Sequence, residues 1–167
     1  SGGGSQLWHN DGGWRFREVT STAFPQRTGI GGDVTGVAFA DLNGDRAMDL
    51  VVNTHAEGLR LLLNDGHGVF RLQPLVQARA RGGHSVALAD VDGDGWMDIY
   101  VCNYRQRALM DMPSARATFR TVQGVQTVAT LDGRPTTDPD LTNRFVVTAQ
   151  GGMEEMGEPD VWYRNLG

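Results

Sequence analysis

The sequence predicts an all-β chain of short antiparallel strands, and three observations support that fold class. The 167 residues include 23 glycines, a number typical of a chain with many tight turns. Short apolar runs rich in β-branched residues alternate with turns rich in Asp, Asn and Gly. The chain also repeats itself with a period near 50 residues, and such a period indicates a repeat architecture.

Two interleaved motifs make up the repeat. Residues 37–45 (VAFADLNGD) recur as residues 86–94 (VALADVDGD), a shift of 49. Residues 7–12 (LWHNDG) line up with residues 61–66 (LLLNDG), a shift of 54, and both copies run on to a Phe at the same offset. Residues 162–165 begin a third copy of this second motif.

Four short strands are predicted in each period. In the better-preserved copy they cover residues 36–40, 50–52, 61–63 and 69–72. Four strands in about 50 residues are typical of a propeller blade. The sequence therefore predicts a partial β-propeller of four-stranded antiparallel blades, about two and a half of them, with a β-hairpin insertion.

The repeat also predicts the domain boundaries. Residues 1–32 form a linker-like start and the end of a preceding blade, residues 33–82 form a complete blade, and residues 83–167 form a second blade that is truncated at its C-terminal end. An insertion at about 104–160 interrupts this second blade, with paired strands at 118–122 and 127–131. We expect the insertion to lie over one face of the propeller; the alternative is a disordered loop.

The negative charge is concentrated rather than spread out. The formal net charge is −5, but seven of the 20 acidic residues fall in two nine-residue windows. Local acidity of this kind indicates a cation site, whereas diffuse acidity would indicate only solubility. The 15 basic residues are all Arg and form no cluster typical of nucleic-acid binding, and no stretch of ~20 apolar residues predicts a membrane span.

The two windows carry oxygen ligands at positions 1, 3, 5 and 9, and the backbone carbonyl at position 7 would complete each set. All-oxygen sites favour Ca²⁺ or Mg²⁺ over Zn²⁺, and an EF-hand is excluded because position 12 is Val rather than Glu. The alternative is a pair of Asp/Gly hairpin turns without an ion. The predicted metal ligands are Asp41, Asn43, Asp45, Ala47 and Asp49 in the first loop, and Asp90, Asp92, Asp94, Trp96 and Asp98 in the second.

We expect two Ca²⁺ sites, the first weaker than the second. Position 6 of such a loop usually has a positive φ, which suits the Gly95 of the second loop. The first loop has Arg46 there, and a residue with a Cβ is strained in that conformation.

These motifs resemble the FG-GAP/VCBS repeat family, whose seven-bladed propellers include the integrin α-chain head. The resemblance rests on residues 41–49 and 90–98, and on the phrases at 7–16 and 61–70. The stretches 138–145 and 157–165 also resemble bacterial relatives of the cartilage acidic protein group. The resemblance implies an extracellular, periplasmic or cell-surface location, calcium in the blade loops, and a role in adhesion or recognition of a protein or glycan ligand.

No catalytic constellation stands out, so the sequence predicts a binding module rather than an enzyme. Cys102 has no His nearby in sequence, and His84 and Ser85 point to opposite faces of one strand. Glu154, Glu155 and Glu158 are candidate acid–base groups of the alternative function, the propeller portion of an extracellular polysaccharide-degrading enzyme. Trp14 and Trp96 are loop aromatics that could stack on a sugar.

The length of the chain bears on its partners. A closed ring at this period needs roughly 350 residues, and open blades expose apolar surface and strand edges. We therefore expect the rest of a larger propeller chain, or self-assembly, to cover those edges.

Overall fold

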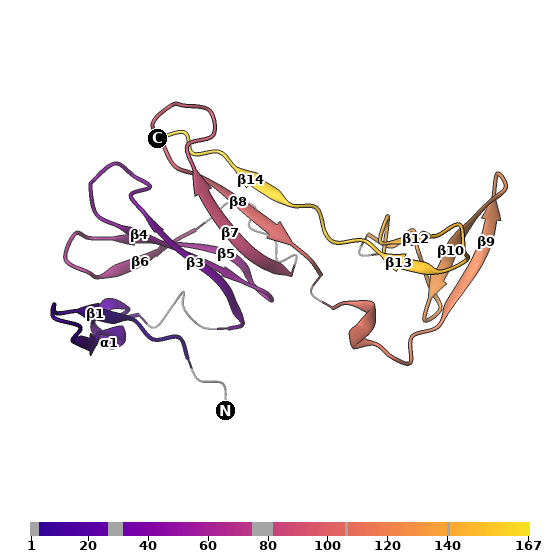
Figure 1. Ribbon diagram of the computed structural model, residues 1–167, viewed down its shortest axis with the longest axis horizontal. Coiled ribbons are helices and arrows are strands. Elements are labelled where there is room, and N and C mark those ends of the chain that lie inside the picture. Colours follow the sequence, from indigo (N-terminus) through magenta and orange to yellow (C-terminus); the bar gives the residue numbers. More distant parts are fainter. Residues whose placement is uncertain (1–3, 27–31, 75–81, 106, 140) are drawn as a thin grey trace.

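The computed structural model describes residues 4–26, 32–74, 82–105, 107–139 and 141–167, and the chain folds into five small antiparallel sheets (Figure 1). The all-β prediction is confirmed, and so is the partial, propeller-like arrangement. Residues 1–3 of the predicted linker-like start, and Asp140 of the stretch that resembles the cartilage acidic protein group, lie outside the described residues.

A four-stranded sheet forms the centre of the blade region. Strands β3 (Val34–Ala40), β4 (Asp49–Thr54), β5 (Gly58–Asn64) and β6 (Phe70–Gln73) pair antiparallel in chain order. Each strand pairs with its neighbour along the chain, which is the meander of a propeller blade. β4 is buried along its whole length, because the N-terminal segment and the neighbouring sheet cover this strand on its two sides.

A three-stranded sheet stacks on one face of that blade. Strands β7 (Gly83–Ala89) and β8 (Asp98–Asn103) repeat the pairing of β3 and β4, and β14 (Val161–Tyr163) pairs with β8 as β5 pairs with β4. The shared core contains Val51 and Leu59 of the first sheet with Ile99 and Val101 of the second. Two equivalent sheets packed face to face through apolar side chains are what neighbouring blades require.

The N-terminal segment covers the other face of the central blade. Strands β1 (Trp8–Asn10) and β2 (Phe16–Glu18) form a hairpin, followed by the short helix α1 (Thr20–Ala23). Ala23 and Phe24 are buried against Leu50 and Val52 of β4. The Phe24 ring stacks on Phe70 with 5.3 Å between centroids, so this segment is fixed to the blade by aromatic and aliphatic packing.

The insertion is a separate, folded region. It begins with the 3₁₀ turn η1 (Leu109–Asp111). Strands β9 (Ala117–Val122), β10 (Val125–Leu131) and β11 (Arg134–Pro135) form one sheet, and β12 (Phe145–Val147) pairs with β13 (Met153–Glu155). The predicted pairing of 118–122 with 127–131 is confirmed, and the disordered-loop alternative is wrong.

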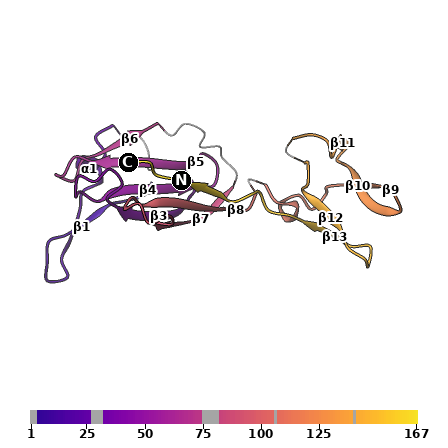
Figure 2. The same cartoon turned by 90° about the horizontal axis from the view of Figure 1, so that it is seen from above.

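The insertion leaves the blade between the end of β8 and the start of β14, and its expected position over one face of the propeller stays a prediction, because the described blades do not close a ring. Figures 1 and 2 show β9 to β13 at one end of the long axis, well away from the blade sheets. Two ion pairs give the region its own support, Arg105 with Glu158 and Arg144 with Glu155, both with 2.6 Å between nitrogen and oxygen. Apolar side chains of its own, including Val128, Leu131 and Leu141, are buried, so the region does not need the blades as a packing surface.

Candidate metal centre

The two acidic loops occupy equivalent places in the two blades. The first joins β3 to β4 and the second joins β7 to β8, and both lie at the end of the sheets opposite to the insertion (Figure 1). β4 and β8 begin at the last Asp of each loop, so position 9 belongs to the strand while the other ligands precede it.

The first Asp of each loop organises the backbone. One carboxylate oxygen of Asp90 accepts hydrogen bonds from the amides of Gly93 and Asp94 at 2.8 and 3.1 Å, and the other accepts from Gly95 at 2.9 Å. Asp41 accepts from the three equivalent amides at 2.8, 3.1 and 2.8 Å. The loops therefore share one conformation, in which a side chain supplies the acceptors that no strand partner provides.

Position 6 has a positive φ in both loops. The φ of Gly95 is 94° and that of Arg46 is 69°. Only glycine adopts this region without a steric penalty from its Cβ. Arg46 keeps the conformation because its amide bonds to Asp41, so the strain expected in the first loop is present in the structure.

Three carboxylates converge in the second loop. Asp90, Asp92 and Asp94 each offer an oxygen, and these oxygens lie within 4.8 Å of one another on the surface of the protein. In the first loop, position 3 is Asn43, and its amide nitrogen donates to the carboxylate of Asp45 at 2.9 Å. The second loop is therefore the stronger candidate, because its donors are all anionic oxygens of the kind that Ca²⁺ prefers.

Position 9 behaves differently from the other predicted ligands. Asp49 and Asp98 are 0% and 1% exposed, and Asp98 does not belong to the carboxylate group that the described residues form. Asp49 accepts backbone hydrogen bonds from Leu42 and Asn64, both at 2.9 Å. Each of these carboxylates therefore ties the acidic loop to the third strand of its own sheet, whether or not it also touches an ion.

The pKa of Asp98 is held below its usual value by the same kind of contact. The strongest cause is the hydrogen bond from the Asn165 amide at 2.8 Å, and the Val91 amide at 3.2 Å adds to it. Hydrogen bonds to the charged form favour ionisation. Asp98 is therefore a buried anion held by backbone amides.

Sequence reasoning missed the role of two asparagines. Asn64 is the last residue of β5, and Asn165 lies two residues after the end of β14. Each donates its side-chain amide to the carbonyl before position 9, at 3.1 and 3.3 Å. Asn165 also donates to the carbonyl of Leu42 in the first loop at 2.8 Å, which links the two blades. The signal was present, since this Asn recurs in every copy of the second motif.

The residues at position 7 lie in the loops as predicted, and their amides donate to the carboxylates at position 5. The bond from Ala47 to Asp45 is 2.7 Å and that from Trp96 to Asp94 is 3.0 Å. The Trp96 ring also packs between the loops, because a Cβ added to Gly44 would lie 2.9 Å from it. Trp96 is therefore a packing residue between blades, while Trp14 is 91% exposed at the tip of the β1–β2 hairpin.

Two of the three candidate acid–base groups, Glu155 and Glu158, hold the insertion together, whereas Glu154 is exposed. Glu155 pairs with Arg144 and accepts a hydrogen bond from the Leu109 amide at 2.6 Å. Glu158 pairs with Arg105, whose side chain is 6% exposed. Both carboxylates are thus occupied by structural contacts.

Comparison with known families agrees with the repeat. The family model described as FG-GAP-like repeat matches residues 1–52 and residues 41–101, which together exceed half of the chain. The chain belongs to the FG-GAP-like repeat family. The matched segments contain both acidic loops, and no curated protein matches the sequence. Membership of the cartilage acidic protein group stays a prediction.

Proposed function

We propose that this FG-GAP-like chain is a non-enzymatic, calcium-binding repeat module of a secreted or cell-surface protein, where it acts in adhesion or in recognition of a protein or glycan. The observation that carries the proposal is the convergence of Asp90, Asp92 and Asp94 in a loop whose backbone recurs in the first blade. Repeats of this family often bind calcium and are typical of extracellular proteins. Among the described residues, no helix is long and apolar enough to cross a membrane.

The donor set fits calcium on chemical grounds. Ca²⁺ takes six to eight oxygens at flexible distances. The second loop presents three carboxylates at an exposed place, where water molecules can supply the remaining ligands. Asp90, Asp92 and Asp94 would hold the ion there. In the first loop Asp41, Asn43 and Asp45 are the corresponding residues. An ion at either place neutralises carboxylates that otherwise repel one another, so its role is to stiffen the loop and the contact between the blades.

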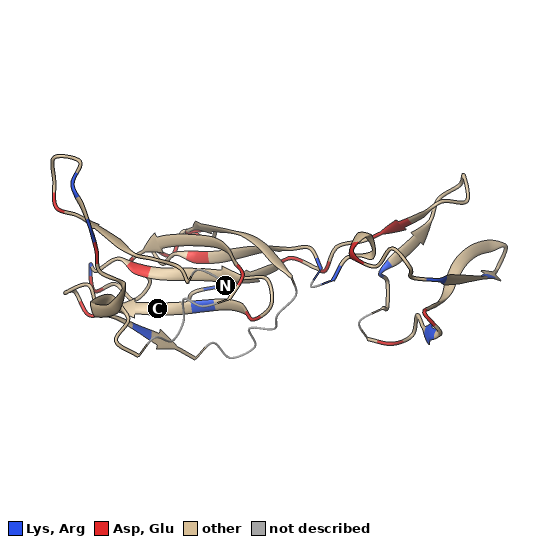
Figure 3. Ribbon diagram, turned by 90° about the horizontal axis from the view of Figure 1, so that it is seen from below, with Lys and Arg blue, Asp and Glu red and all other residues tan. Residues whose placement is uncertain are grey.

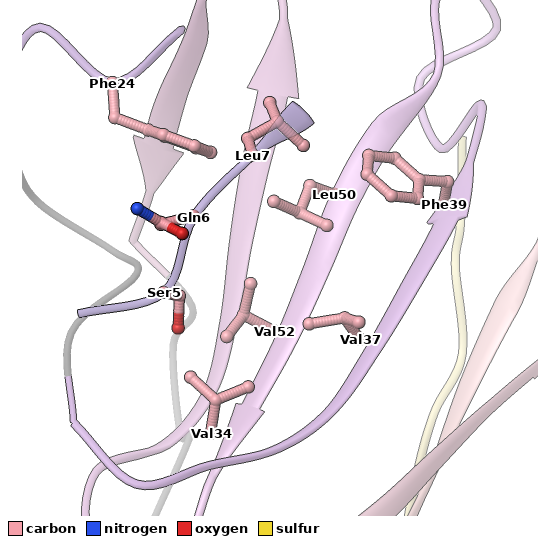
Figure 4. A pocket seen from close by; sticks show the side chains of 9 residues that line it. All are labelled: Ser5, Gln6, Leu7, Phe24, Val34, Val37, Phe39, Leu50 and Val52. Atoms are coloured by element: carbon pink, nitrogen blue, oxygen red, sulfur yellow. The ribbon is translucent and has the colours of Figure 1, made fainter. Parts of the chain in front are cut away.

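An apolar face of the central blade supports the partner proposal. Val37 and Phe39 of β3 are 58% and 50% exposed, and with Leu50 and Val52 they line a cavity of about 180 Å³ beneath the N-terminal segment (Figure 4). Their counterparts in β7 pack against the central blade. We propose that a further blade, from a larger propeller chain or from a second copy, covers this face.

The distribution of basic residues agrees with a partner other than nucleic acid. Figure 3 shows the Arg positions scattered along the ribbon, over the blades, the N-terminal hairpin and the insertion, rather than gathered in one region. Nucleic-acid binding relies on clustered Lys and Arg that contact successive phosphates. A protein or glycan ligand is therefore the better match to this surface.

Thermal unfolding with and without calcium tests the metal proposal. If each site binds with Kd near 10⁻³ M, as extracellular calcium sites do, tenfold excess calcium adds about 1.4 kcal/mol per site to the free energy of unfolding. Calcium should therefore raise the Tm relative to chelator, and Asp90→Asn should remove much of that rise. Glu154→Gln, an exposed acid outside the loops, is the matched control. An equal Tm in calcium and in chelator would contradict the proposal.

A further inference from the structure

An arginine lies directly on the carboxylate group of the second loop. Arg164 follows the last residue of β14, and its Nε lies 2.5 Å from Oδ2 of Asp92. One of its terminal nitrogens lies 3.6 Å from Oδ2 of Asp94. The guanidinium thus contacts two of the three carboxylates that would hold an ion.

The first blade has no such group in the matching position. The register of β14 against β8 and of β5 against β4 places Arg164 where the first blade has Leu63. The same comparison places the charged Asp92 where the first loop has the neutral Asn43. An extra carboxylate in one loop is therefore accompanied by an extra cation that directly follows the third strand of the same blade.

We propose that Arg164 is the internal counter-ion of the second loop: in the calcium-free protein it pairs with Asp92, and it gives way when calcium binds, so that it sets the calcium affinity of this loop. The inference rests on the proposed calcium function. It assigns to one residue, contributed from beyond the insertion, the regulation of that site.

Electrostatics supports this competition. Three carboxylates within 4.8 Å of one another repel, and a guanidinium beside them offsets part of that repulsion. A divalent cation that binds Oδ2 of Asp92 must either displace Arg164 or bind next to its positive charge. Calcium binding is weakened in either case. The Arg164 side chain is 53% exposed, so it can turn into water without a desolvation penalty.

The decisive variant is Arg164→Leu, which installs the residue of the first blade. Without calcium, the variant should have a lower Tm than the wild type, because the carboxylates lose their counter-ion. Calcium titration by calorimetry should show binding to the second loop about tenfold tighter than in the wild type. The Tm rise on adding calcium should therefore be larger in the variant.

Three further variants isolate the cause. Arg164→Lys keeps the charge and should bind calcium close to the wild-type affinity. In an Asp92→Asn background, Arg164→Leu should change the affinity much less, because the paired carboxylate is gone. Arg120→Leu removes an exposed arginine of the insertion and should change neither calcium affinity nor the calcium-dependent rise in Tm.

The outcomes separate this inference from the proposed function. A variant Arg164→Leu that loses stability equally with and without calcium, at unchanged affinity, would overturn the counter-ion role and leave calcium binding intact. If calcium changed the Tm of neither the wild type nor the variants and calorimetry detected no binding, the proposed function would be overturned, and the competition between Arg164 and calcium with it. In chelator, a lower Tm of Arg164→Leu than of the wild type that disappears at 1 M salt supports the pairing of Arg164 with Asp92, since salt screens exposed charges.

Discussion

The two acidic loops share a backbone but differ in their charges. In both, the first Asp accepts three amides, the last Asp is buried, and an Asn at or just after the end of the third strand closes the loop. The differences are Asn43 against Asp92, Arg46 against Gly95, and Leu63 against Arg164. Hydrogen bonds to the protein itself therefore build the loop, and the variable side chains adjust how strongly it attracts a cation.

The same comparison extends to the contact between blades. Val34 of β3 and Gly83 of β7 are equivalent, but Val34 packs against the apolar cluster of the central blade, whereas Gly83 lies against the buried polar side chain of Asn53. Neighbouring copies of a repeat thus need different residues at one position, because each blade meets a different neighbour.

The largest effect is expected for Gly83→Ala. A Cβ there would lie 2.4 Å from Oδ1 of Asn53, whose side chain is fully buried. Overpacking of this kind should lower the free energy of unfolding by about 3 kcal/mol. Urea denaturation followed by circular dichroism measures it.

The control for that substitution is Val34→Ala, which removes part of a half-buried side chain at the equivalent position. It should lower the free energy of unfolding by about 1 kcal/mol. A Gly83→Ala variant as stable as Val34→Ala would show that the blades separate more easily than the structure indicates.

A smaller effect is expected for Asp49→Asn. The amide group would place a donor against the amide of Leu42 or Asn64, which both now donate to a carboxylate. The free energy of unfolding should fall by about 2 kcal/mol in chelator, where no ion contributes. The exposed Glu154→Gln, outside both loops, is the control, and a fall seen only in calcium would contradict the structural role.

Asp98→Asn tests the buried carboxylate of the second loop through the pH dependence of the Tm. The pKa of Asp98 is lower in the folded protein than its unfolded value of about 3.9. The contribution of ionised Asp98 to the free energy of unfolding is therefore fully present above the unfolded pKa, and it is lost as the pH falls through the folded pKa. Between pH 5 and pH 3, the wild-type Tm should therefore fall more steeply than that of Asp98→Asn. Identical slopes would show that Asp98 gains nothing from the amides of Asn165 and Val91.

The smallest effect concerns position 6. Arg46→Gly should raise the free energy of unfolding by about 0.5 kcal/mol, because it relieves a positive φ at some entropic cost. Gly95→Ala should lower it by about 1 kcal/mol through backbone strain alone, since a Cβ there meets no atom within 4 Å. Effects of the same sign in the two variants would show that the loops do not share a conformation.

Much of the fold could be predicted from local pattern. The repeat at a shift of 49 placed β3, β4, β7 and β8, because strand alternation and turn glycines depend on neighbouring residues. The expected positive φ at Arg46 followed from the same alignment. The predicted ligands at positions 1, 3 and 5 lie in one loop of fixed geometry, and their spacing alone brings them together.

Long-range contacts could not be predicted in that way. Arg164 and Asn165 meet the second loop across 67 or more residues, and the repeat showed where they lie in the blade but not what they touch. The insertion is held together by its own buried ion pairs, such as Arg144 with Glu155, which no periodicity reveals. The burial of Asp49 and Asp98 likewise depends on the neighbouring strand rather than on spacing.

The attachment of the insertion has a consequence for how the protein can vary. Its two ends leave the blade side by side: Asp160 accepts from the Tyr100 hydroxyl and the Asn103 amide, both at 2.8 Å, and the Glu158 amide donates to the Tyr104 carbonyl at 2.5 Å. This short stem and the pairing of β14 with β8 fix where the chain returns to the blade. We therefore expect that the segment beyond the stem can be exchanged, shortened or grafted as a cassette, so that new surfaces are acquired without rebuilding the repeat scaffold.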